Sequence, residues 1–182
     1  FADLPSIPAK HWTKNIGFHP YLRDEDTLSR PWVVPGTPGL EHRIGGLEKD
    51  YDSGNISYLA ENHDRMVRVR ATKIARIADD LAPVTAAGSP DADVLVVGWG
   101  STFGSIEAAV RELAEEGIPV AHAHLRWLNP FPPGLGELLA RYRAVIVREL
   151  NLGRLVRLLR DRFLVAALSI VCPMNAASFL RT

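Results

Sequence analysis

Residues 93–104 read Asp-Val-Leu-Val-Val-Gly-Trp-Gly-Ser-Thr-Phe-Gly, and this stretch is the clearest indication of the fold class. A short apolar run rich in valine meets a cluster of glycines, and apolar residues then recur at helical spacing. The run suits a strand that is buried on both faces of a sheet. A strand that turns through glycines into a helix is typical of parallel α/β proteins.

The same order of elements repeats towards the carboxyl end of the chain. Further strands are expected at residues 120–125, 144–147 and 163–171, and helices near residues 106–116, 135–139 and 152–159. Alternating strands and helices with short connections predict a parallel sheet with right-handed crossovers. We therefore expect an α/β fold, a small and mostly parallel sheet with flanking helices, over about residues 92–182.

The first half of the chain has a different texture. Residues 1–60 are crowded with proline, glycine and aromatic residues, which predicts an irregular segment that packs on a neighbouring surface. Residues 62–82 predict one amphipathic helix with Asn62 as its N-cap, stopped before Pro83. Residues 83–91 are expected to be a linker. The expected organisation is thus 1–82, the linker 83–91, and 92–182.

Composition excludes several classes of protein. Of the 182 residues 47% are apolar and 23% charged, as in folded globular proteins. Basic and acidic residues balance at 21 each, so neither a broad basic face nor a nucleic-acid partner is expected. No apolar run reaches the roughly 18 residues of a membrane helix, so no membrane partner is expected. Because the chain opens with Phe1, we expect a fragment.

The glycine-rich turn is the most site-like feature of the sequence. Its residues could form a tight turn at an interface or a weak anion site: Gly98, Trp99, Gly100, Ser101, Thr102 and Gly104. The spacing G-x-G-x-x-x-G is one residue longer than the dinucleotide fingerprint, and the acidic residue expected about 20 positions later is missing. A stand-alone nucleotide-binding module nevertheless remains the alternative hypothesis.

Two histidines and one glutamate form the other candidate group. His122 and His124 alternate along a strand and should therefore share a face, and Glu149 is the one obvious third metal ligand. Histidines of a core or an interface are the favoured interpretation. Residues 148–151 follow a strand at the edge where open sheets place their sites, but they indicate no particular chemistry. We expect no catalytic, cofactor-binding or metal-ligating residue in this chain.

The single cysteine, Cys172, excludes an intrachain disulfide and a cysteine-ligated cluster. It lies in an apolar run, which predicts an inert thiol. One cysteine in 182 residues also suits a reducing compartment, so a cytoplasmic location is expected.

Several motifs together carry a family resemblance. The first half contains Arg30-Pro-Trp32, Pro35-Gly-Thr-Pro-Gly-Leu-Glu-His-Arg-Ile-Gly-Gly-Leu-Glu-Lys49 and Gly54-Asn-Ile-Ser-Tyr58. The second half adds the 93–102 stretch, Ala121-His-Ala-His-Leu125, Leu128-Asn-Pro-Phe131 and Glu149-Leu-Asn-Leu-Gly153. Over about residues 1–165 the chain resembles the alpha subunit of 2-oxoacid:ferredoxin (acceptor) oxidoreductases, the 2-oxoglutarate type in particular. From about residue 166 it departs from the family pattern.

The resemblance implies a role within a larger enzyme. The family decarboxylates a 2-oxoacid oxidatively, forms an acyl-CoA and reduces ferredoxin through an iron–sulfur cluster. Thiamine diphosphate and magnesium lie mainly on a beta subunit, so the expected assembly is a hetero-oligomer. Residues 1–82 would comprise the tail of the thiamine-fold domain and a connecting helix. Residues 92–182 would resemble the carboxyl-terminal domain of transketolase.

The chain by itself is therefore expected to be inactive and to serve assembly. Both the glycine-rich turn and residues 30–58 carry aromatic side chains that need a surface to cover them. We expect the isolated chain to self-associate, and Trp99→Ala to weaken assembly more than folding, with an ordinary core tryptophan as the alternative. A pure scaffolding domain is the third hypothesis.

Overall fold

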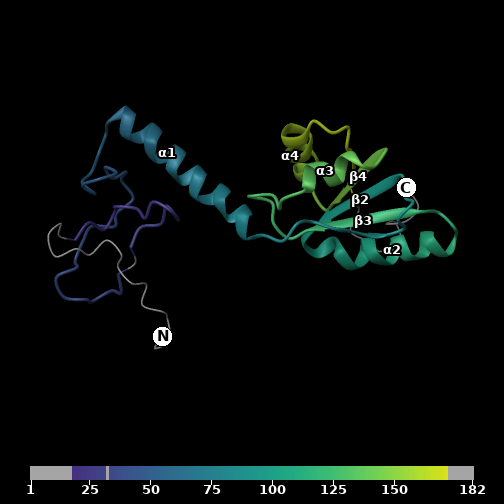
Figure 1. The fold of residues 1–182 in the computed structure, drawn as a ribbon, viewed down its shortest axis with the longest axis horizontal. Coiled ribbons are helices and arrows are strands. Elements are labelled where there is room, and N and C mark those ends of the chain that lie inside the picture. Colours follow the sequence, from purple (N-terminus) through teal and green to yellow (C-terminus); the bar gives the residue numbers. More distant parts are fainter. Residues whose placement is uncertain (1–17, 32, 172–182) are drawn as a thin grey trace. The chain divides into compact units, whose positions relative to one another are not determined.

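The computed structural model describes residues 18–31 and 33–171. They form two compact units, which divide between Ile77 and Ala78. Figure 1 shows the elements of each unit along the chain. Cys172 and most of the stretch that departs from the family pattern lie outside the described residues.

The first unit holds few regular elements before its helix. Residues 18–31 and 33–59 form turns, bends and irregular stretches, and Lys49 and Ile56 pair in an isolated bridge. The helix α1 spans Ala60–Ala75, and a 3₁₀ turn, Arg76–Asp80, continues it. The irregular segment and the long helix are therefore where the sequence predicts them.

The start of α1 differs from the expectation. The N-cap is Leu59, whose side chain makes no capping hydrogen bond, and Asn62 lies inside the first turn. The buried Asn62 amide donates to the Lys49 carbonyl at 3.0 Å, and its oxygen accepts the Tyr51 N–H at 3.1 Å. Asn62 therefore fastens the preceding turn to α1, a tertiary role that the local capping pattern does not predict.

The second unit is built on one sheet. Its strands are β1 (Ala86–Gly88), β2 (Val94–Trp99), β3 (Val120–Leu125), β4 (Ala144–Glu149) and β5 (Leu168–Val171). In the described residues their order is β1-β3-β2-β4-β5. β1 runs antiparallel to β3, whereas the pairs β2–β3, β2–β4 and β4–β5 are parallel. The predicted α/β fold with a mostly parallel sheet is confirmed.

β1 lies in the segment for which the sequence predicts a linker. The run Ala86-Ala87-Gly88 has little intrinsic preference for a strand, but it pairs with residues 121–123 of β3. At Gly88 the backbone has φ +105°, and a Cβ there would lie 2.5 Å from the Val120 carbonyl oxygen. Pairing with the sheet therefore recruits residues that would otherwise form a connection.

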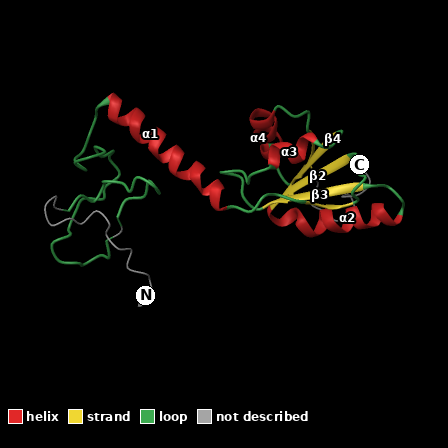
Figure 2. Ribbon diagram, viewed as in Figure 1, coloured by secondary structure: helices red, strands yellow, loops and turns green. Residues whose placement is uncertain are grey.

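Three helices cover the two faces of the sheet (Figure 2). Helix α2 spans Phe103–Glu115 and lies on one face. Helices α3 (Leu135–Ala140) and α4 (Arg154–Phe163) lie on the other. Because both faces are covered, alternate residues of one central strand enter different clusters, as Val96 and Val97 of β2 do.

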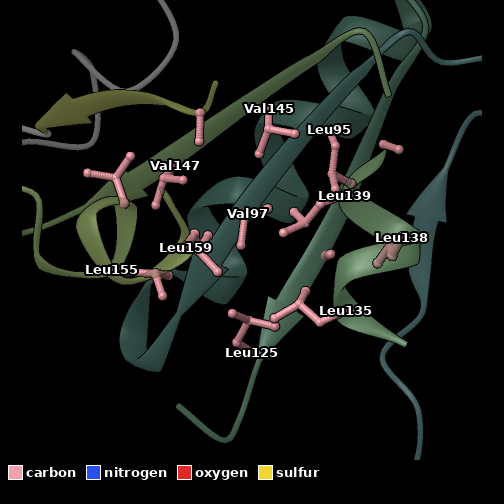
Figure 3. Close-up of a cluster of buried hydrophobic side chains, with 14 residues drawn as sticks. Leu95, Val97, Leu125, Leu135, Leu138, Leu139, Val145, Val147, Leu155 and Leu159 are labelled. Carbon is pink, nitrogen blue, oxygen red and sulfur yellow. The ribbon is translucent and has the colours of Figure 1, made fainter. Parts of the chain in front are cut away.

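The larger hydrophobic core fills the space between the sheet and α3 and α4 (Figure 3). Its fully buried side chains include Leu95, Leu125, Leu139 and Leu159. A smaller cluster, formed by Ile106, Val110 and Val120, lies beneath α2. Among the described residues, none of the helices combines the length and apolar character that a membrane crossing requires.

Candidate functional site

The glycine-rich stretch does not form an open loop. Gly98 and Trp99 end β2, Gly100–Thr102 forms one 3₁₀ turn, and Phe103 and Gly104 already belong to α2. The buried Thr102 hydroxyl closes this turn on Trp99. It accepts the Trp99 N–H at 3.1 Å and donates to the Trp99 carbonyl at 2.9 Å. The strand thus passes into the helix through one tight turn.

Gly98 is required by close packing. A Cβ built on this glycine would lie 2.3 Å from Ile106 Cδ1 and 2.8 Å from Thr102 Oγ1. The space that a side chain would take at Gly98 is filled by Thr102 of the turn and Ile106 of α2, both buried. Gly104 differs, since a Cβ there would meet no atom within 4 Å.

The two aromatic residues of the turn have different environments. Trp99 is half-buried and packs against the larger core, whereas Phe103 is 46% exposed. The Phe103 ring stands 5.6 Å from the His122 ring and 5.1 Å from the His124 ring, measured between centroids. Phe103 therefore lies against both histidines from the first residue of α2.

The predicted shared face of the two histidines is confirmed. The His122 and His124 rings lie 5.8 Å apart on the α2 side of β3. His122 Nε2 and His124 Nδ1 are buried, and neither has a hydrogen-bond partner among the described residues. Burial and the neighbouring His124 lower the pKa of His122 to about 4. Burial is also the main cause that lowers the pKa of His124, and a hydrogen bond with the Gly100 backbone opposes it.

Protonation of His122 should therefore destabilise the fold in acid. The unfolded chain takes up this proton near pH 6.5 and the folded chain only near pH 4. The contribution of His122 to the free energy of unfolding is thus constant above about pH 7 and falls as the pH drops towards 4, by at most about 1.4 kcal/mol per pH unit. We expect His122→Leu to flatten this dependence in chemical denaturation series. The unsubstituted chain is the reference, and an unchanged slope in His122→Leu would contradict the assignment.

Glu149 does not join the histidines. It lies on β4, which β2 separates from β3, and its side chain is 1% exposed. Its carboxylate accepts the Leu155 N–H at 2.8 Å and the Val156 N–H at 3.0 Å. Glu149 is thus not available as a third metal ligand beside His122 and His124, because its carboxylate is hydrogen-bonded to the first turn of α4. Within residues 18–31 and 33–171, no group of three or more potential ligands is placed to hold a metal ion.

The stretch that follows β4 is a capping segment. Asn151 Oδ1 accepts the Arg154 N–H at 2.8 Å, and Glu149 takes the next two N–H groups of α4. The free N–H groups at the start of a helix need such partners. The position past a strand end therefore serves the structure of α4.

A cleft of about 830 Å³ opens beside the start of α2. Residues 82–87, the end of β2, the start of α2, and β3 with the residues that follow it contribute to its lining. Of the turn residues singled out from the sequence, Trp99 and Gly100 line this cleft. Gly98, Ser101, Thr102 and Gly104 do not.

Sequence reasoning missed Arg126 and Trp127, which also line the cleft. Both are exposed, Trp127 at 53%, and they follow the carboxyl end of β3. Arg126 makes no hydrogen bond or ion pair with the part of the chain that the structure describes. Their position directly after a strand could have identified them, since sites in open sheets usually lie at the edge formed by the carboxyl ends of parallel strands.

Comparison with known proteins defines the class of this domain. Residues 92–167 match the family model "Pyruvate:ferredoxin oxidoreductase core domain II". A solved 2-oxoglutarate:ferredoxin oxidoreductase from Magnetococcus marinus, with 2-oxoglutarate, coenzyme A and succinyl-CoA bound, superposes with a TM-score of 0.79 at 29% identity. That match covers 93% of this chain and 30% of the solved chain.

Curated relatives narrow the assignment. The chain is 51% identical over 176 residues to the 2-oxoglutarate oxidoreductase subunit KorA of Mycobacterium tuberculosis, a match that covers 95% of this chain and 26% of that protein. It is 32% identical over 140 residues to the 2-oxoglutarate synthase subunit KorA of Methanocaldococcus jannaschii, covering 72% of this chain and 37% of that protein. The chain belongs to the alpha-subunit family of 2-oxoacid:ferredoxin oxidoreductases.

The chain spans about a quarter of the length of the M. tuberculosis relative. The alternative hypothesis, a stand-alone nucleotide-binding module, is not favoured, because the relatives are subunits of 2-oxoacid oxidoreductases.

Proposed function

We propose that the chain forms part of the alpha subunit of a 2-oxoacid:ferredoxin oxidoreductase. This enzyme would oxidatively decarboxylate a 2-oxoacid, form an acyl-CoA and pass the electrons to ferredoxin. The observation that carries the proposal is the 51% identity along 95% of the chain. The names of two relatives and the ligands of the solved structure favour 2-oxoglutarate as the substrate.

The described residues fit a supporting role better than a catalytic one. An iron–sulfur cluster takes about four thiolates, and this chain has a single cysteine. Its described residues also bring no metal-binding group together. We therefore assign the cluster to other parts of the enzyme, and by the family resemblance we assign thiamine diphosphate and magnesium to a beta subunit. The single cysteine suits a reducing compartment, so we place the enzyme in the cytoplasm.

We propose that the glycine-rich turn, Gly98 to Gly104, and residues 30–58 serve assembly with a beta subunit. Large apolar side chains remain exposed in both regions. Phe103 is 46% exposed in the turn, and Ile44 is 71% and Tyr58 is 85% exposed in the earlier segment. Exposed apolar surface of this kind usually marks a contact that is missing. Trp99 packs on the core in addition, so its replacement would affect folding as well.

The experiment uses the complete enzyme, purified with all its subunits. We expect 2-oxoglutarate to drive the reduction of ferredoxin only when coenzyme A is present, and succinyl-CoA to accumulate in step. Pyruvate serves as the control for the choice of substrate, and NAD⁺ as the control for the acceptor. Absence of any 2-oxoacid-dependent reduction of ferredoxin would refute the proposed function.

A further inference from the structure

The cleft beside α2 exposes aromatic side chains next to an arginine, a combination that is typical of protein interfaces. Phe103 and Trp127 expose about half of their side chains at its wall, and Arg126 stands beside them. Tryptophan and arginine are the residue types that most often dominate the energy of protein interfaces. The cleft thus has the composition of a contact centre.

The described lining of the cleft carries positive charge that no acidic lining residue balances. Arg126 is exposed, lies close enough to His124 to influence its titration, and makes no ion pair with any described residue. Among the described residues that line the cleft, none is acidic. The amino end of the 13-residue helix α2 adds positive potential at the same place. The charge complement of this cleft is therefore an anionic group, which in a protein partner is a carboxylate.

The two histidines beneath Phe103 also indicate that a polar partner is missing from this cleft. His122 is only 6% exposed, yet its Nε2 has no partner among the described residues, and the same holds for His124 Nδ1. Buried polar groups of folded proteins nearly always have partners, and an unpaired one costs about 1–3 kcal/mol. Both histidines line the cleft, so a polar group of a partner that enters it would supply the missing hydrogen bond.

We propose that this cleft receives a segment of another subunit of the same enzyme, in which an apolar or aromatic side chain lies next to a carboxylate. The apolar side chain packs against Phe103 and Trp127, and the carboxylate pairs with Arg126. This inference rests on the proposed function, because it takes its partner from the assembly. It adds the chemistry of the contact and the residues that make it.

The test measures subunit association in the complete enzyme. We expect Arg126→Glu and Trp127→Ala each to weaken the association of the alpha subunit with its partner by about tenfold or more. The effect of Arg126→Glu should shrink as salt is added, and that of Trp127→Ala should not. Arg111→Glu on α2 and Leu158→Ala on α4 are matched controls, since both residues are exposed and lie outside the cleft.

A photo-reactive amino acid at position 127 identifies the occupant. We expect cross-linking to one peptide of another subunit that contains aspartate, glutamate or a chain terminus beside an apolar residue. Cross-linking to the alpha subunit itself, to a peptide without a carboxylate, or to nothing would overturn the inference. So would association equal to that of the controls. Activity with 2-oxoglutarate is measured separately, so an active enzyme with unaffected association refutes the cleft contact and leaves the proposed function intact.

Discussion

Replacing Glu149 with alanine is expected to lower the free energy of unfolding by about 3 kcal/mol. The carboxylate accepts two backbone N–H groups at the start of α4, and both belong to residues that are at most 2% exposed, Leu155 and Val156. Alanine would leave both donors buried and unpaired. Each such donor costs about 1–3 kcal/mol, whereas an exposed N-cap typically contributes about 1.

Asn151→Ala is the matched control for this prediction. Asn151 caps the preceding N–H of the same helix, that of the exposed Arg154, at 2.8 Å. Because water can reach that donor after the substitution, the loss should be about 1 kcal/mol. Equal losses for the two variants in urea denaturation would show that the buried donors at the start of α4 carry no special cost.

Replacing Gly98 with alanine is expected to lower the free energy of unfolding by about 2–3 kcal/mol. The added methyl group would overlap the buried Ile106 side chain and the Thr102 hydroxyl, which two hydrogen bonds hold on Trp99. The core beneath α2 is small, and Ile106 is 1% exposed, so relief of the overlap requires Ile106 to adopt a strained side-chain conformation or the helix to shift.

Gly104→Ala, in the same glycine-rich turn, should have the opposite sign. Gly104 is the second residue of α2 and a methyl group there would meet open space, so alanine should be neutral or stabilise by about 0.5 kcal/mol. Thermal and urea denaturation of the two variants decide between a packing role for Gly98 and a general need for flexibility. Equal destabilisation by both substitutions would contradict the packing role.

The regular elements could be predicted because their signals are local. The predicted strand at residues 120–125 coincides with β3, since an apolar run between turn formers is recognisable without knowledge of its neighbours. The shared face of His122 and His124 follows from the twofold period of a strand. β1 escaped prediction because Ala86-Ala87-Gly88 becomes a strand only through its pairing with β3.

The candidate site could be predicted only in part, because its residues meet through the tertiary structure. Arg126 and Trp127 form a candidate site only together with Phe103, which lines the same cleft from a different element. The same limit explains the metal set. Glu149 is the last residue of β4, where a ligand could lie, but its carboxylate is hydrogen-bonded to α4, and no spacing in the sequence reveals the position of that helix.

We propose that this chain supplies structure to a 2-oxoacid:ferredoxin oxidoreductase whose chemistry takes place in other parts of the enzyme. The decisive assay is the reduction of methyl viologen with 2-oxoglutarate and coenzyme A. It is run in parallel on the isolated 182-residue chain and on the complete enzyme at equal molar concentration. We predict turnover by the complete enzyme and none above a protein-free control by the isolated chain. Turnover by the isolated chain would contradict the claim.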